Sequence, residues 1–174
     1  LIFHVRTHNN ALYPSSINPK ATYISNIDFS RFDPIEWLID ECHKRGIEMH
    51  AWMNPYRYST TYQTGTMPSA NPQSSSSNLL EGKILNPALS NVKNHIYATI
   101  EEFVNRYPTV DAIHFDDYFY VSTTASPTSA DARRAHINEL ISGIHSRLAS
   151  FNEANNRHVQ FGISPTGIYR NGNG

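Results

Sequence analysis

The sequence predicts an α/β fold with a parallel sheet of the (β/α) TIM-barrel type. Strand-like apolar runs alternate along the chain with amphipathic helical segments, a pattern typical of parallel βαβ units. The connections after strands are long and those after helices are short, as in a barrel whose active site is built from the loops after its strands. A doubly wound sheet is the alternative, but no G-x-G-x-x-G turn follows the first strand.

At 174 residues the chain has the length of one domain, residues 1–174. It holds about four βα units, and a closed barrel of this type needs eight. We therefore expect a partial barrel. The chain begins inside an apolar, strand-like run, Leu1–Val5, which is typical of a piece of a longer protein rather than of a signal peptide.

The first elements are a strand over 1–6, a long loop over 7–32 and a helix that begins after Asp33. Asp33 is the expected N-cap, Pro34 lies in the first turn, and Gly46 ends the segment. The apolar face of this helix has helical spacing and is formed by Ile35, Leu38, Ile39 and Cys42. Because Cys42 is the only cysteine, an internal disulfide is excluded, and we expect its side chain to be buried.

The remaining elements alternate in the same way. Residues 58–83 are rich in Ser, Thr, Asn and Pro and predict a loop or lid. The expected strands cover 47–53, 110–116 and 159–164, and the expected helices cover 90–107 and 130–151.

Composition excludes some classes of function. The formal net charge is −1 and no basic stripe is present, which argues against a nucleic-acid partner. No apolar run approaches the length of about 18 residues that a transmembrane helix needs.

The most informative stretch is 110–120, in which an apolar strand leads into Asp116 and Asp117. Two adjacent carboxylates repel each other, so the pKa of at least one is expected to rise near apolar walls. A strand that ends in acids beside aromatic rings is typical of glycosidases. The alternative is structural, because Asp at a strand end often accepts hydrogen bonds from the backbone of the next loop.

Polar and aromatic residues gather at the carboxyl ends of all the predicted strands. Strand alternation would place one set of these side chains on a single face of the sheet: His4, Arg6 and His8 from the first strand, Glu48, His50, Trp52 and Asn54 from the second, and His114 and Asp116 from the third. Buried polar groups cost free energy unless they are paired, so such a cluster indicates a ligand site or, alternatively, a hydrogen-bonded polar plug. The candidate substrate-binding residues are Arg6, His50, Trp52, Asn54, Tyr56, Arg57, His114, Tyr118 and Tyr120.

Three histidines, His4, His50 and His114, recur at similar depth on successive strands, and three histidines are able to hold zinc. Helical H-x-x-x-H spacing and paired cysteines are absent, and Arg6 would repel a cation. We therefore expect polar contacts with a sugar at this position and no metal or other cofactor.

Several ordered motifs resemble one known family. They are Val5-Arg6, Ala11-Leu12-Tyr13, Asp33-Pro34, Ala51-Trp52, Asn54-Pro55-Tyr56-Arg57, Leu85-Asn86-Pro87, His114-Phe115-Asp116-Asp117-Tyr118-Phe119, and Gly162-Ile163-Ser164-Pro165 to Arg170-Asn171. The chain is similar over nearly its whole length to the glycosyl hydrolase-like 10 family of bacterial cell-envelope proteins. The resemblance implies a TIM-barrel glycoside hydrolase. It also implies a secreted, periplasmic or lipoprotein-anchored location and a polysaccharide substrate such as peptidoglycan glycan strands.

Two departures from the family pattern stand out. The family domain usually has a further strand upstream and several βα units downstream. Relatives often have an acid where this chain has Asn10, and the loss of that acid would weaken the site if it takes part in chemistry or binding.

The resemblance implies roles for individual residues. Asp116, at the end of what would be the fourth barrel strand, is expected to be the nucleophile or base. Asp117 orients it, or is itself the functional carboxylate if the strand register shifts by one residue. Glu48 is the other inward carboxylate but is expected to lie too deep, so the general acid is expected outside this chain.

Aromatic and basic side chains would complete the site. The aromatic residues are expected either to stack on sugar rings or to serve in ordinary packing; they are Trp52, Tyr56, Tyr118 and Tyr120. Arg6 and Arg57 are expected to hold carboxylates of the substrate.

Two other classes of function remain open on the sequence. One is a carbohydrate-binding protein on a degenerate barrel, which keeps the aromatic residues and lacks a paired acid. The other is a structural half-barrel that is stable only with a second copy or with its missing half. Exposed strand edges would make such a piece self-associate.

Overall fold

The computed structural model describes residues 1–64, 67–82, 84–116, 119–120 and 129–165. Its central sheet has four parallel strands, which lie side by side in the same order as they occur in the chain. The order is β1 (Ile2–Arg6), β3 (His50–Met53), β7 (Ala112–Phe115) and β8 (Gln160–Ile163). A doubly wound sheet reverses its strand order near the middle, whereas a barrel does not. The predicted parallel α/β fold is therefore confirmed, with the strand order of a partial barrel.

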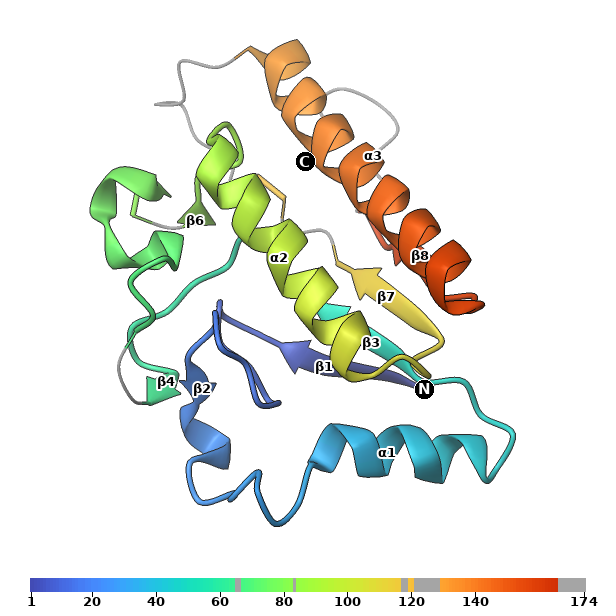
Figure 1. Cartoon of the computed structure of the whole chain (residues 1–174). Helices are drawn as coiled ribbons and strands as arrows, with labels where there is room; N and C mark the ends of the chain where they lie inside the picture. The colour runs from blue at the N-terminus through green and yellow to red at the C-terminus, as the bar shows by residue number, and fades with distance from the viewer. Residues whose placement is uncertain (65–66, 83, 117–118, 121–128, 166–174) are drawn as a thin grey trace.

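Three α-helices connect the strands: α1 (Pro34–His43), α2 (Ser90–Arg106) and α3 (Ala130–Asn155) (Figure 1). The N-cap prediction for α1 is confirmed, because the Asp33 carboxylate accepts hydrogen bonds from the backbone N–H groups of Ile35 and Glu36. β3 begins later than predicted. The backbone N–H of Met49 donates to the Asp111 side chain, 2.7 Å away.

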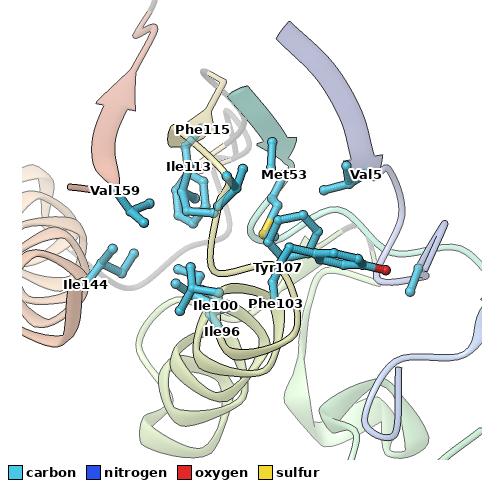
Figure 2. Close-up of a cluster of buried hydrophobic side chains, with 14 of the residues drawn as sticks. Val5, Met53, Ile96, Ile100, Phe103, Tyr107, Ile113, Phe115, Ile144 and Val159 are labelled. Atoms are coloured by element: carbon cyan, nitrogen blue, oxygen red, sulfur yellow. The ribbon is translucent and has the colours of Figure 1, made fainter. Parts of the chain in front are cut away.

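The helices and one face of the sheet enclose a single apolar core, and we call this face the core face (Figure 2). The sheet contributes Met53, Ile113 and Phe115, which pack against α2 and α3. Burying each such side chain stabilises the fold by about 1.5–3 kcal/mol. Cys42 is buried in the same cluster, as predicted.

The long loops after β1 and β3 contain short elements that the sequence did not predict. β2 (Lys20–Ala21) pairs with β4 (Gln63–Thr64), and β5 (Leu79–Leu80) pairs with β6 (Ile84–Leu85). Three 3-10 turns accompany them: η1 (Thr22–Ile24), η2 (Pro72–Ser74) and η3 (Ser76–Asn78). Figure 1 shows β2, β4 and β6 on the side toward which the arrow of β1 points.

Helices α2 and α3 approach closely at Gly143. A Cβ atom at this position would lie 2.2 Å from the Tyr97 hydroxyl oxygen. Tyr97 is held in place, because its hydroxyl donates to the Glu139 carbonyl at 3.1 Å and the Arg147 guanidinium lies 3.8 Å from its ring centroid. The missing side chain at Gly143 therefore makes room for the tyrosine.

We predict that Gly143→Ala destabilises the protein. Alanine in a helix normally gains up to about 1 kcal/mol over glycine, but forcing an atom into a packed contact costs about 1–3 kcal/mol. The second effect should win, with a net loss of about 1 kcal/mol or more in urea unfolding. Ser142→Ala, at the exposed neighbouring position, is the control and should change stability by less than about 0.5 kcal/mol. An unchanged or raised stability of Gly143→Ala would contradict this packing.

Candidate functional site

The site lies on the side of the sheet opposite the core face. His4, Trp52, His114 and Gly162 are register partners across β1, β3, β7 and β8, so their Cβ positions form one row. We call this side the open face. The His4, Trp52 and His114 side chains are only partly buried.

Asp116 follows the end of β7 and lies beside this row. Its carboxylate accepts a hydrogen bond from Trp52 Nε1 at 3.0 Å. Asn54 Nδ2 lies 3.1 Å from one carboxylate oxygen and 3.0 Å from the other. Asp116 is 9% exposed. Two N–H donors on β3 and the loop after it therefore orient the carboxylate that the sequence proposed as nucleophile or base.

Asn54 links several parts of the site. It is fully buried, and its Oδ1 accepts the backbone N–H of Arg57 at 2.8 Å. Its backbone carbonyl accepts a hydrogen bond from Arg6 Nη1, and its backbone N–H donates to the Arg6 carbonyl at 2.9 Å. An amide has a donor nitrogen and an acceptor oxygen at different positions. The contact of Nδ2 with Asp116 and the contact of Oδ1 with Arg57 therefore both fix its orientation.

Arg6 does not lie on the face that the sequence predicted. A β-bulge between His4 and Arg6 shifts the register, so that Arg6 pairs with Met53. The expectation that His4 and Arg6 share a face is therefore wrong. Arg6 is 1% exposed, and burial lowers the pKa of its guanidinium to about 10. In this position Arg6 acts on the site through its hydrogen bonds with the Asn54 backbone.

The Arg6 guanidinium belongs to a buried polar cluster that we call the rim network, formed by Arg6, Asn9, Asn18, Asn71 and His95. Arg6 donates to the side-chain oxygens of Asn9 and Asn18. His95 Nε2, on α2, lies 3.0 Å and 3.2 Å from the same two oxygens. Asn9 Nδ2 donates to Asn71 Oδ1 at 2.7 Å. The network thus ties the loops after β1 and β3 to α2.

Sequence reasoning missed the rim network. One feature of the sequence could have predicted it. On α2, His95 and Thr99 are four residues apart beside the apolar stripe, and both are buried. Two polar residues at this spacing on a buried helix side need partners. Asn9, with a positive φ of 54°, is a residue type that tolerates this conformation.

Two tyrosines that were predicted to bind substrate make other contacts in the structure. Tyr56 is 0% exposed and packs in the core, so its ring offers no face to a ligand in this structure. The Tyr120 hydroxyl lies 2.8 Å from His136 Nδ1 on α3.

His50 and His114 lie on the open face, but His50 is two residues before Trp52, the register partner of His4 and His114, so the prediction that the three histidines lie at similar depth is wrong. His50 Nε2 is 3.0 Å from Glu48, and His114 Nε2 is 3.0 Å from the Ser164 hydroxyl. Burial lowers the pKa of His114, with a smaller effect of the same sign from His50. Arg57 is partly exposed.

The structure tests further points of the prediction. Glu48 precedes β3, at the opposite end of that strand from Asn54, as predicted, but its side chain is exposed. Asn10 is fully buried, and its Oδ1 lies 3.3 Å and 3.1 Å from the backbone nitrogens of Thr7 and His8, so it organises the loop. Asp117 and Tyr118 lie outside the described residues.

Two features are absent from the part of the chain that the structure describes. In this part of the chain no group of three His, Cys, Asp or Glu side chains is arranged to hold a metal ion. Among the described helices, none has the length and apolar character needed to cross a membrane.

The chain is similar to known proteins in sequence and in fold. The sequence model of the glycosyl hydrolase-like 10 family matches residues 1–174. Glycosyl hydrolase DigH of Escherichia coli (strain K12) is 31% identical over 98% of this chain and 45% of its own length. Glycosyl hydrolase YngK of Bacillus subtilis is 30% identical over 98% of this chain and 37% of its own length. The chain therefore spans less than half the length of these curated relatives.

A solved structure of an uncharacterized protein from Listeria monocytogenes is similar with a TM-score of 0.53. It is 12% identical, and the match covers 95% of this chain and 18% of that one. At this identity the likeness concerns the fold alone.

We predict that Asn54→Asp destabilises the protein in a pH-dependent manner. The variant keeps the acceptor for the Arg57 N–H but places a second carboxylate about 3 Å from Asp116, which raises the pKa of the pair in the folded state above the unfolded value. The penalty should be about 3 kcal/mol near neutral pH. It should shrink as the pH falls from about 6 toward about 4, where the folded pair takes up a proton before the unfolded chain does.

Urea unfolding at neutral and acidic pH measures this difference. Asn94→Asp, at an exposed position of α2, is the matched control and should show no such trend. A penalty that is small, or that does not shrink in acid, would contradict the observed contact between Asn54 and Asp116.

We predict that His95 causes part of the loss of stability in acid. Burial, and then Arg6, lowers the pKa of His95 from 6.5 to about 3. Because the folded value is the lower one, this stabilising contribution is present above about pH 6.5 and is lost as the pH falls toward the folded pKa. His95→Gln should reduce the loss between about pH 6.5 and 4.5 by about 2 kcal/mol.

The measurement is the free energy of unfolding as a function of pH. His145→Gln, on the exposed side of α3, serves as the control. An identical pH dependence for wild type and His95→Gln would show that His95 is not held neutral by burial.

Proposed function

Because the chain belongs to the glycosyl hydrolase-like 10 family, we propose that it is part of a glycoside hydrolase in which Asp116 is the nucleophile or base. One observation carries this proposal. The Asp116 carboxylate lies at the carboxyl end of β7, beside the open face, and is oriented by Trp52 Nε1 and Asn54 Nδ2. Catalytic groups of barrel enzymes lie at the carboxyl ends of strands.

Two hydrogen-bond donors give this carboxylate a fixed direction. In a retaining reaction it would attack the anomeric carbon, with a second carboxyl group about 5–5.5 Å away as the acid. In an inverting reaction it would activate a water molecule, with the acid about 6.5–9.5 Å away. In the proposal this acid is a carboxylate from another part of the full-length protein.

The proposed substrate is a bacterial cell-envelope polysaccharide such as the glycan strands of peptidoglycan. Support comes from the family membership and from the names of the relatives, which are bacterial glycosyl hydrolases. Trp52 and Arg57, both partly exposed, would contact sugar rings and substrate carboxylates. With such a substrate, we also propose a location outside the cytoplasm, in which the protein is secreted, periplasmic or attached to the envelope as a lipoprotein.

A second candidate is a carbohydrate-binding protein on a degenerate barrel. The position of Glu48 favours it, because this carboxylate lies at the far end of β3 from Asp116. Self-association is a separate proposal, supported by exposed apolar residues on the two edge strands of the sheet. Ile2 on β1 is 52% exposed, and Ile163 on β8 is 40% exposed.

We predict that Asp116→Asn in the full-length protein lowers the rate of glycan hydrolysis at least about a thousandfold. The amide keeps the size of the carboxylate but is neither a nucleophile nor a base. Glycan affinity should change less than about threefold, since sugar binding depends on the surrounding side chains. Product analysis on peptidoglycan and on a simple glucan measures the rate and the substrate class together.

Asp40→Asn, at an exposed position of α1, is the matched control and should leave the rate unchanged. Hydrolysis that survives in Asp116→Asn would exclude the proposed role of Asp116. Binding of glycans by wild type without any hydrolysis would instead support the carbohydrate-binding alternative.

A further inference from the structure

His4 and Trp52 form a parallel ring stack on the open face. Their ring centroids are 3.9 Å apart and their planes differ by 3°. They are register partners on β1 and β3, so the strand pairing itself places one ring over the other. The same indole donates through Nε1 to Asp116, 3.0 Å away. One face of Trp52 is therefore covered by His4 while its edge orients the carboxylate.

The His4 ring does not act as an exposed acid or base. Its Nε2 is buried and has no hydrogen-bond partner among the described residues. Burial lowers the pKa of His4 to about 4, which outweighs the opposing effect of Asp116. The charges of Arg57 and His8 lower the pKa further, and a backbone hydrogen bond to Arg6 raises it. The ring is thus neutral near neutral pH.

We propose that His4 is a positioning residue that acts through Trp52, because its ring fixes the indole in the orientation that donates to Asp116. The consequence for catalysis rests on the proposed function. Without the stacked ring, the indole gains freedom to rotate about its side-chain bonds, and Nε1 leaves the line to the carboxylate. Asn54 would then be left as the donor from β3 and the loop after it.

The energetics favour a role for the ring face rather than for the ring nitrogens. The unpartnered Nε2 is unfavourable in a buried position, so this nitrogen does not explain the placement of the ring, and the contact with Trp52 is made by the imidazole face. A neutral flat ring covers the indole without placing a positive charge beside the Asp116 carboxylate. A ring of similar shape, such as phenylalanine, should therefore replace it, whereas a non-aromatic side chain of similar size should not.

The test compares His4→Leu with His4→Phe in the full-length protein. The first readout is the hydrogen exchange of the Trp52 indole N–H by NMR, with its signal assigned by its loss in Trp52→Phe. Exchange should rise at least about tenfold in His4→Leu and stay within about threefold of wild type in His4→Phe. If His4→Leu does not fold, His4→Gln, which also lacks a ring, replaces it.

The second readout is hydrolysis. In His4→Leu kcat should fall about ten- to hundredfold because the carboxylate loses its alignment, whereas KM should change less than about twofold. His4→Phe should restore kcat. His145→Ala, an exposed histidine of α3, is the control and should behave as wild type.

The outcomes separate this inference from the proposed function. Unchanged indole exchange in His4→Leu, or equal damage in His4→Leu and His4→Phe, would overturn the positioning role. The expected exchange pattern in a protein that hydrolyses no glycan would support the positioning of Trp52 and refute the hydrolase assignment.

Discussion

The contact between the Asn54 amide and the Asp116 carboxylate is the interaction on which the site depends. A single buried side chain reaches both oxygens of the acid while its own oxygen accepts the Arg57 backbone N–H. Rotation of the amide by half a turn would exchange donor and acceptor and lose both sets of contacts. The end of β3 and the end of β7 are therefore locked together where the chemistry is proposed.

The parallel sheet explains why these groups meet. Strand register is set by the core face, where Met53 and Phe115 are partners, and the alternation of side chains then places Trp52 and His114 together on the open face. Arg6 supports the site from the helix side by holding the Asn54 carbonyl. Its buried guanidinium donates to side-chain amide oxygens of the rim network and to backbone carbonyls, and these hydrogen bonds offset the cost of its desolvation.

The sequence predicted what depends on local pattern. Periodicity identified the four strands and three helices, and the N-cap of α1 followed from Asp33 and Pro34. The alternation of β3 and β7 placed Trp52 and Asn54 on the same side as Asp116, and their contacts bear this out.

What the sequence did not predict depends on contacts between distant residues. The bulge in β1 adds one residue between His4 and Arg6 and sends the arginine to the core face, and no local signal marks it. The β2–β4 pair and the rim network join the loop after β1 to a Ser- and Asn-rich segment about 50 residues later. Low-complexity composition indicated a loop there but not its partners.

A structure of the full-length protein with a bound glycan fragment tests the central claim most directly. The account predicts a sugar anomeric carbon within about 3.5 Å of an Asp116 oxygen, or joined to it through one water molecule, on the open face beside Trp52. A productive glycan bound elsewhere, with Asp116 out of reach of every glycosidic bond, would contradict it.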